Sequence, residues 1–355
     1  MTIRFFFLLL VLSPASIVAE VPPKAPTRLD RTQLLLFHDA DGRVVQGKAR
    51  RDWEKRRAKI LKAMQEVMGP LPGKEKRCPL EVHLVEEVDC GSYVRRLICY
   101  SSEPDSRVPA YLLIPKKALQ KTRVRAVLCP HPTDSKVGHK VVVGLGGKEN
   151  RSYASELAER GFVTLAPAYP HLANYAPDLK SLGYESGTMK AIWDNIRGID
   201  LLESLPFVKR GGVASIGHSL GGHNSIYTAA CDPRIKVIVS SCGFDSYLDY
   251  MDGKIKGWTS ERYMPKLLNY PLAEIPFDFH EIIGALAPRP LFVNAPLGDT
   301  NFKWKSVDNV THAARTIYKL YGAEDKLKVT HPDCGHDFPD EIREQAYEFF
   351  ESNLR

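Results

Sequence analysis

The stretch GVASIGHSLGG, residues 212–222, joins an apolar strand-like run to a segment with helix-forming residues. The run before Gly217 is short and apolar, which favours a buried strand, and residues 221–230 favour a helix. Residues 217–221 fit the pattern G-x-S-x-G, in which a serine occupies a tight strand-to-helix turn and its hydroxyl stands above the sheet edge. We therefore predict that Ser219 is a nucleophile; the alternative is a tight turn without chemistry.

Outward from this turn, short apolar runs alternate with amphipathic segments from Arg125 to the end of the chain. We expect strands at 126–130, 162–167, 212–217, 236–242, 289–296 and 327–334, and helices at 152–161, 189–205, 221–230, 307–321 and 341–353. This alternation predicts an α/β fold with a mostly parallel central sheet and helices on both faces. Residues 243–281 interrupt the rhythm with short polar and aromatic pieces, which indicates a cap-like insert.

The N-terminal third has a different pattern. Residues 1–19 combine Arg4, an apolar run over residues 5–12 and small residues up to Ala19, as in a secretory signal peptide. The run is shorter than the ~20 residues that span a bilayer, so we expect no membrane span and a secreted or periplasmic protein. Residues 20–107 are expected to form an N-terminal extension with a basic helix and the first strands.

The charge balance excludes few functions. The chain has 49 Lys and Arg against 42 Asp and Glu, a formal charge of +7 over 355 residues, which does not indicate nucleic-acid binding. Basic residues are dense only between Lys48 and Lys62, where we expect a solvated helix face; an anion or polysaccharide contact is the alternative. The seven cysteines match no zinc motif, so no metal is expected. Their spacing leaves open a disulfide from Cys90 to Cys99 or Cys78.

A serine nucleophile needs a histidine as base and a carboxylate to orient it, in the chain order Ser, acid, His for this type of turn. His336 lies in GHDFP, residues 335–339, on a loop before the last helix, whereas its rival His331 lies at a strand end. Asp299 follows the penultimate strand, where open α/β sheets carry their working residues. Asp245, after the preceding strand, is the competing acid. We predict Asp299 and His336.

An oxyanion hole needs two backbone N–H groups near the nucleophile. The residue after the nucleophile supplies one, which is Leu220 here. The other is expected from the loop CPHPTDS, residues 129–135, after the first parallel strand. Pro132 has no N–H, so we predict Thr133, with Asp134 next; an ordinary exit turn is the alternative.

These residues resemble those of the α/β-hydrolase superfamily, and within it secreted acetyl xylan esterase-like and dienelactone hydrolase-like proteins. The resemblance covers residues 108–355, the expected catalytic domain, and rests on RVPAYLLIP, CPHPT, ELAERGFVTLAP, the helix with Trp193-Asp194-Asn195 and Arg197, GHSLGG, LGD and GHDFP. It implies a serine carboxylic-ester hydrolase without a cofactor, with Ser219, Asp299 and His336 as its triad. His131-Pro132 departs from the His-Gly that is frequent in this family.

The leading hypothesis is an exported esterase that removes small acyl groups, chiefly acetyl, from a small-molecule or polysaccharide ester. The insert interleaves its aromatic residues with charges, which suits a sugar better than a fatty acid, although core packing is the alternative for them. Among them are Tyr247, Tyr250, Trp258, Tyr263, Phe277 and Phe279. A prolyl oligopeptidase-type peptidase has the same catalytic order, but the ~90 residues before Val108 are few for a propeller of ~40 residues a blade. A dienelactone hydrolase-like enzyme and a non-catalytic hydrolase-fold protein are further alternatives.

Overall fold

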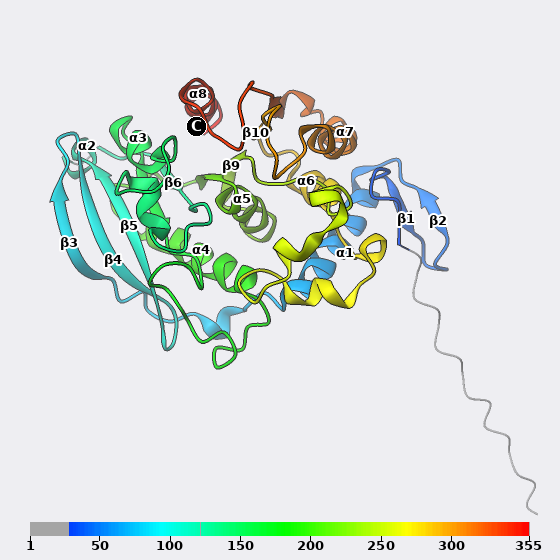
Figure 1. Cartoon of the computed structure of the whole chain (residues 1–355), viewed down its shortest axis with the longest axis horizontal. Coiled ribbons are helices and arrows are strands. Elements are labelled where there is room, and N and C mark those ends of the chain that lie inside the picture. The colour runs from blue at the N-terminus through cyan, green and yellow to red at the C-terminus, as the bar shows by residue number, and fades with distance from the viewer. Residues whose placement is uncertain (1–27, 121, 355) are drawn as a thin grey trace, which may run out of the picture.

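The computed structural model of the chain describes residues 28–120 and 122–354 (Figure 1). The predicted signal peptide, residues 1–19, lies outside these ranges. Among the described residues, no helix carries an apolar stretch long enough to cross a bilayer. The strands are β1 (Leu36–His38), β2 (Val44–Gln46), β3 (His83–Asp89), β4 (Tyr93–Glu103), β5 (Ser106–Pro115), β6 (Ala126–Leu128), β7 (Val163–Pro167), β8 (Val213–His218), β9 (Ile235–Ser241), β10 (Leu291–Asn294) and β11 (Leu327–Thr330).

The helices lie between and around these strands. The α-helices are α1 (Arg50–Met68), α2 (Lys116–Leu119), α3 (Tyr153–Glu159), α4 (Gly187–Ser204), α5 (Leu220–Cys231), α6 (Phe279–Leu286), α7 (Trp304–Leu320) and α8 (Asp340–Asn353). The 3-10 turns are η1 (Lys74–Lys76), η2 (Gly138–Val143), η3 (Tyr250–Gly253), η4 (Ile255–Trp258), η5 (Pro265–Asn269), η6 (Leu272–Glu274) and η7 (Glu324–Lys326).

Nine strands form one central sheet in the order β11-β10-β9-β8-β6-β7-β5-β4-β3. Strands β6 to β11 pair in parallel, and β3, β4 and β5 add an antiparallel edge. The predicted mostly parallel sheet is therefore confirmed. The expected domain boundary at residue 108 falls inside β5, which pairs with β4 along its length, so strands on both sides of that boundary belong to the same sheet.

The sheet has a core on each face, because side chains alternate along a strand. Val127, Val237 and Val239 are fully buried in one cluster with α3 and α8. Ala126 and Ile238 are fully buried in the opposite cluster, with α4, α5, α6 and α7 (Figure 1). Helices thus cover both faces, and the carboxyl ends of the parallel strands remain for the loops that carry Ser219, Asp299 and His336.

Helix α1 confirms the solvated-face interpretation for most of the basic cluster, but Arg57 is half-buried and donates to the backbone oxygen of Ala285 at 3.0 Å, and Arg56 is buried. Trp53 and Met64 are buried on its inner side. The exposed basic residues are Lys48, Arg50, Arg51, Lys55, Lys59 and Lys62. Arg56 differs, because it is only 3% exposed and donates a hydrogen bond to Glu281 of α6. A run of like charges in the sequence does not reveal which member turns inward to a distant carboxylate.

The seven cysteines are all unpaired. The disulfide left open between Cys90 and Cys99 or Cys78 is therefore absent. Cys129 and Cys242 are buried, as expected of small thiols at the ends of core strands.

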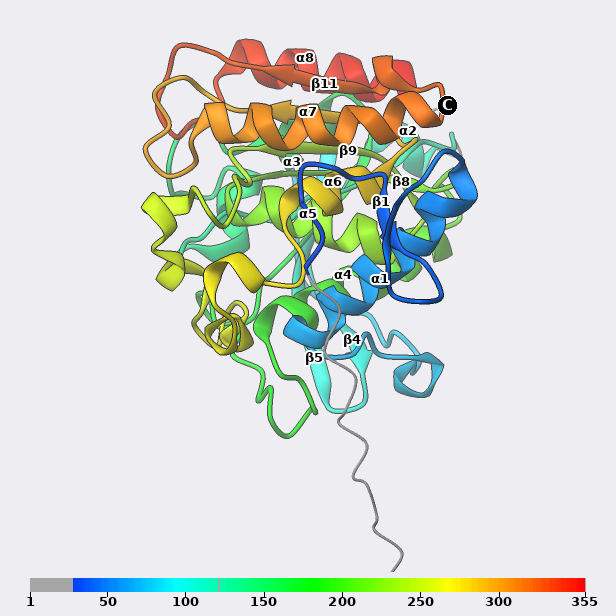
Figure 2. The ribbon, with the colours of Figure 1, turned by 90° about the vertical axis from the view of Figure 1, so that its right-hand side faces the viewer.

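The insert, coloured yellow in Figure 2, consists of the short turns η3 to η6 rather than long helices. Of the six insert aromatics named above, four are buried in the core, namely Tyr247, Trp258, Phe277 and Phe279. They pack on one another, with ring centroids 5.5 to 5.9 Å apart. Of the two interpretations of these aromatics, core packing is therefore confirmed for these four residues. Tyr250 and Tyr263 are half-buried.

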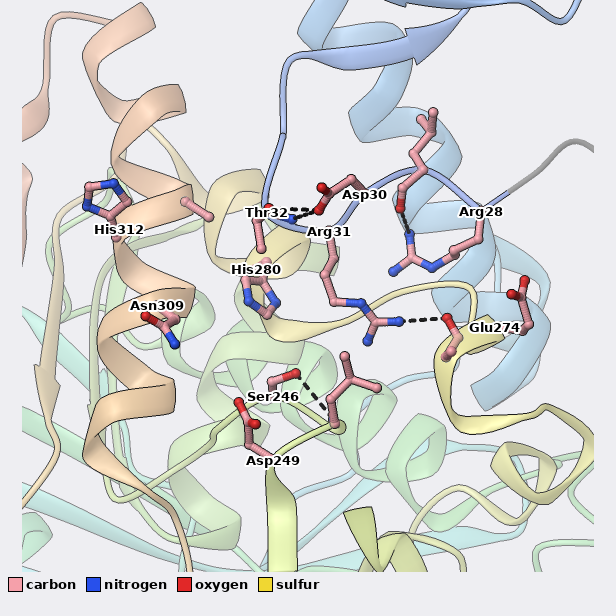
Figure 3. A pocket seen from close by; sticks show the side chains of 14 residues that line it. Arg28, Asp30, Arg31, Thr32, Ser246, Asp249, Glu274, His280, Asn309 and His312 are labelled. Atoms are coloured by element: carbon pink, nitrogen blue, oxygen red, sulfur yellow. Dashed lines mark hydrogen bonds between the residues drawn. The ribbon is translucent and has the colours of Figure 1, made fainter. Parts of the chain in front are cut away.

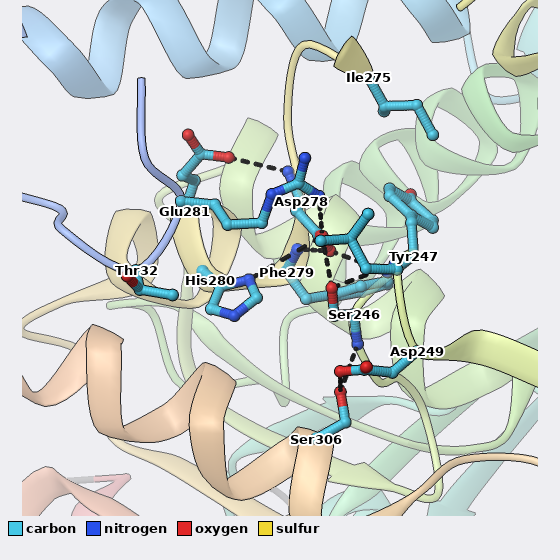
Figure 4. A network of polar contacts seen from close by, with 12 residues as sticks. Thr32, Ser246, Tyr247, Asp249, Ile275, Asp278, Phe279, His280, Glu281 and Ser306 are labelled. Atoms are coloured by element: carbon cyan, nitrogen blue, oxygen red, sulfur yellow. Dashed lines mark hydrogen bonds and ion pairs between the residues drawn. The ribbon is translucent and has the colours of Figure 1, made fainter. Parts of the chain in front are cut away.

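A buried ionic network joins the start of the described chain to α6 (Figure 4). Arg28 forms a two-pronged pair with Glu281, with both N–O distances at 2.7 Å, and Arg56 reaches the same carboxylate at 3.1 Å. Arg31 bonds the Asp278 carboxylate at 2.6 Å. Burial opposes ionisation of Glu281, but the hydrogen bond and charge of Arg28 and the charge of Arg56 bring its pKa below its usual value.

We expect Glu281→Gln to lower the free energy of unfolding by ~3–5 kcal/mol, since it leaves the buried Arg56 and the half-buried Arg28 without their counter-charge. Urea denaturation measures the change. Glu87→Gln is the matched control, because it removes an exposed pair with Arg96, for which ~0.2–1 kcal/mol is typical. Equal losses in the two variants would contradict the assigned role of the network.

The same variant has a pH signature. Because the folded-state pKa of Glu281 is lowered, its contribution is complete above the unfolded-state value and is lost as the pH falls through the folded-state value. The stability difference between the natural chain and Glu281→Gln should therefore be largest near neutral pH and shrink below about pH 4. A difference that grows on acidification would be inconsistent with an ionised Glu281.

Candidate active site

Ser219 occupies a strained turn between β8 and α5. Its φ of 55° and ψ of −120° are unusual for a residue with a side chain. A Cβ on Gly217 would lie 2.1 Å from the carbonyl of Gly221, and a Cβ on Gly221 would lie 2.2 Å from the oxygen of Pro130. Both glycines are therefore required by close backbone approach, as the sequence pattern predicts, and Ser219 is left half-buried at the strand end.

His336 and Asp299 come together from two different loops. The Nδ1 atom of His336 lies 3.0 and 2.9 Å from the two carboxylate oxygens of Asp299. Burial opposes ionisation of Asp299, but the hydrogen bond and charge of His336 and the amides of Phe302 and Asn301 bring its pKa below the usual value. An ionised Asp299 accepts the Nδ1 proton, so a neutral His336 has Nε2 as its basic nitrogen.

The two alternative residues have other contacts. His331 is engaged at both ring nitrogens, with Nδ1 2.7 Å from the carbonyl oxygen of Ala295 and Nε2 2.9 Å from Asp308. Asp245 is fully buried and accepts the amide of Lys303 at 3.2 Å, while its other oxygen has no partner among the described residues. Burial raises the pKa of Asp245 to about 8. A carboxyl group that is largely protonated at neutral pH is a poor partner for an imidazolium.

Ser219 and His336 line one small pocket of about 90 Å³. The other residues in its wall are Pro132, Thr133, Asp134, Val141, Lys148, Arg151 and His218. Asp299 supports His336 from behind this pocket, with its side chain 1% exposed. The geometry therefore unites the three predicted side chains from the loops after β8, β10 and β11.

The predicted oxyanion donors are placed differently with respect to this pocket. Thr133 lines the pocket. His131 holds the loop that carries Thr133: its ring lies 2.7 Å from the Pro132 oxygen and accepts a hydrogen bond from the Tyr169 amide at 3.0 Å. Leu220 is buried at the first position of α5, where a helix leaves its N–H groups unpaired. The Thr133 hydroxyl also lies 3.0 Å from the Tyr263 hydroxyl, so the insert reaches the pocket wall.

His218 and Arg151 are pocket residues that the sequence analysis did not assign. The ring of His218 is 4.8 Å from that of His336, and its Nδ1 lies 2.9 Å from the Ser241 hydroxyl. Burial, with the nearby charges of Arg151 and His336, lowers the pKa of His218 well below its usual value, so this ring is neutral. His218 is the first x of G-x-S-x-G, a position that carries no signal for this role, and Arg151 belongs to no motif.

One group of side chains has the composition of a soft-metal site. Ligand atoms of His218, Cys242 and His336 lie within 4.8 Å of one another. Zinc prefers nitrogen and thiolate ligands, but burial and the neighbouring Asp299 raise the pKa of the Cys242 thiol well above its usual value. The His336 Nδ1 atom is also committed to Asp299. The chemistry of this group fits a hydrogen-bonded support for His336 better than a metal centre.

A roomier cavity of about 640 Å³ lies elsewhere (Figure 3). It is bounded by residues 28–32, the loop after β9, η6, α6 and α7, and His280 and Asp249 face it. None of Ser219, Asp299 and His336 is in its wall. The size of a cavity therefore does not identify the candidate active site in this fold.

Comparison with known proteins supports the assignment of the fold. No model of a protein family matches the chain. "Putative hydrolase YtaP" of Bacillus subtilis is 24% identical over 309 residues, which cover 84% of this chain and 100% of that protein. The solved structure of a glucuronoyl esterase from Solibacter usitatus has a TM-score of 0.75 at 19% identity, covering 93% of this chain and 99% of the other. Acetyl xylan esterase 1 from Thermoanaerobacterium has a TM-score of 0.55 at 17% identity, covering 83% and 99%. The chain has the α/β-hydrolase fold, as the sequence predicted.

Proposed function

We propose that the protein is a serine carboxylic-ester hydrolase that removes small acyl groups, chiefly acetyl, from carbohydrate. The observation that carries the proposal is the shared pocket of Ser219 and His336, with the imidazole held by an ionised Asp299. The proposal includes export, for which the sequence pattern of residues 1–19 is the support. Two of the similar proteins with solved structures are a glucuronoyl esterase and an acetyl xylan esterase by name, which is consistent with a carbohydrate ester as substrate.

The proposed reaction proceeds through an acyl-enzyme. The Ser219 oxygen attacks the ester carbonyl carbon while His336 Nε2 takes the hydroxyl proton. Asp299 stabilises the imidazolium, and the amides of Leu220 and Thr133 stabilise the negative oxygen of the tetrahedral intermediate. The intermediate collapses as the alcohol leaves with the proton from His336. Water, deprotonated by the same imidazole, then attacks the acyl-serine. The acyl–oxygen bond breaks as His336 returns the proton to the Ser219 oxygen, which releases the carboxylic acid.

Two features favour a small acyl group. The pocket volume of about 90 Å³ is well under the ~300–1,000 Å³ of most drug-sized ligand sites. Most apolar aromatic side chains of the insert are buried in the core. They therefore do not form a long apolar surface on which an alkyl chain could bind. Hydrolysis of a glucuronoyl ester is the second candidate, favoured by the extent of the match to the Solibacter usitatus structure.

An assay of the chain from residue 20 onward on four substrates tests the proposed function: p-nitrophenyl acetate, acetylated xylan, a benzyl ester of glucuronic acid and a prolyl peptide. We expect cleavage of the two acetyl esters. Cleavage of the benzyl glucuronate alone would replace acetyl removal by the second candidate, and cleavage of the peptide alone would contradict an esterase.

Ser219→Ala should lower kcat/KM for p-nitrophenyl acetate by at least ~10³-fold, because it removes the attacking oxygen. Ser260→Ala is the matched control, since Ser260 is an exposed serine on the insert. The two variants should unfold at the same temperature as the natural chain. Substantial activity in Ser219→Ala would rule out this nucleophile.

Asp299→Asn should lower turnover by ~10⁴-fold, because the amide favours the wrong imidazole tautomer. Asp245→Asn should cost little, since burial raises the pKa of Asp245 to about 8 and the neutral acid resembles an amide. Initial rates with p-nitrophenyl acetate compare the two variants. A larger loss of turnover in Asp245→Asn than in Asp299→Asn would instead identify Asp245, in the loop after β9, as the acid.

Acetyl and propionyl esters should be preferred to octanoyl esters by ~10-fold or more, because a tight pocket discriminates by ~1–3 kcal/mol per methylene. A methylene that stays in water also forgoes ~0.8 kcal/mol of transfer energy. The comparison of kcat/KM over a p-nitrophenyl ester series from two to eight carbons measures this preference. A maximum at eight carbons would indicate a lipase-like enzyme instead.

A further inference from the structure

The position of His336 depends on a loop without regular secondary structure. Residues 331–339 connect β11 to α8 and contain only bends and irregular backbone. Asp299 holds the ring at Nδ1, but a side-chain hydrogen bond does not fix where the backbone of His336 lies. Because catalysis depends on reacting atoms placed to within about 1 Å, whatever holds this backbone also controls the imidazole.

Arg151, two residues before α3, reaches across to this loop. Its Nη2 atom donates to the backbone oxygen of His336 at 3.1 Å, and its Nη1 atom donates to the Asp337 carboxylate. Asn150 donates to the other Asp337 oxygen at 2.8 Å. Asn150 and Arg151, which are adjacent in sequence, therefore bind His336 and Asp337, which are adjacent in the loop of residues 331–339.

The chemistry of this contact requires an arginine. The guanidinium offers five donors in a rigid plane, and Arg151 also donates to the backbone oxygens of Glu149 and Asn150 at 3.2 and 3.0 Å. Its side chain is 4% exposed. Burial opposes ionisation of Asp337, but Arg151 and Asn150 bring its pKa below the usual value, so the buried cation has an ionised partner. The ammonium group of a lysine, on a flexible side chain, cannot donate hydrogen bonds in the same directions.

The loop has other attachments that do not involve Arg151. Asn294 donates to the backbone oxygen of Asp337 at 3.0 Å, and the Cys242 thiol lies 3.3 Å from the same oxygen. These contacts tie the loop to the ends of β9 and β10. Loss of Arg151 should therefore shift the loop locally rather than unfold the protein.

We propose that Arg151, together with Asp337, is a positioning residue for His336: it sets the imidazole against Ser219 through the loop backbone and does not take part in proton transfer. The inference rests on the proposed function of His336 as the general base. It extends that function to a residue outside the triad and the oxyanion loop.

The test uses Arg151→Gln, Arg151→Lys and Asp337→Asn in the full chain. Arg160→Gln is the matched control, since Arg160 also links α3 to α8 through Glu344 and Glu351 but lies away from His336. We expect kcat for p-nitrophenyl acetate to fall ~10–100-fold in Arg151→Gln and in Asp337→Asn, with KM changed by less than ~3-fold. Arg151→Lys should restore only part of kcat, and Arg160→Gln should leave it unchanged.

A spectroscopic readout separates positioning from a general loss of structure. The low-field NMR signal of the His336 Nδ1 proton, identified by its absence in His336→Gln, should broaden or vanish in Arg151→Gln and persist in Arg160→Gln. An unaltered signal in Arg151→Gln, or an equal loss of kcat in Arg160→Gln, would overturn the proposal. If Arg151→Gln fails to fold, Asp337→Asn is judged by the same two readouts. A natural chain without esterase activity would contradict the proposed function, while the NMR comparison would still decide whether Arg151 positions the ring.

Discussion

The close approach of α5 to the end of β8 is the constraint on which the site depends. A side chain at Gly221 would collide with the backbone of Pro130, and one at Gly217 would collide with Gly221 itself. The helix can therefore begin directly at the strand end only if Ser219 accepts a positive φ. This single turn brings the first amides of α5, the loop after β6 and the serine hydroxyl to one place. Its backbone strain costs of order 1–3 kcal/mol, which the packing of the surrounding sheet offsets.

The parallel sheet explains why residues far apart in sequence converge there. The carboxyl ends of β8, β10 and β11 lie at the same edge, and each ends in a loop that supplies one of Ser219, Asp299 and His336. The sequence predicts the sheet, the turn and these three residues, because each depends on local signals: apolar runs, paired glycines and the position of a loop after a strand. The sequence positions of Asp245 and His331 are almost as suitable, and only the structure shows that their side chains have other contacts.

Other features depend on contacts over long sequence distances and leave no local signal. Arg56 resembles its exposed neighbours on α1 but turns inward to Glu281, 225 residues away. The aromatics of the insert alternate with charges like a binding surface, yet most of them fill the core. Arg151 meets His336 across 185 residues. Composition and spacing indicate which interactions a residue can make. The tertiary fold determines which partner it contacts, and this contact determines its role.

The charges around His336 combine into a consistent electrostatic arrangement. Asp299 is ionised on the Nδ1 side of the ring, and its charge favours the imidazolium that proton transfer creates. His218 packs beside the same ring but stays neutral, because burial lowers its pKa well below the usual value, so it does not repel a charged His336. Arg151 is paired with Asp337, and its charge also helps to lower the pKa of His218. Among the residues that the structure describes, Asp299 is thus the carboxylate that contacts the imidazole, and it is the one that catalysis would need.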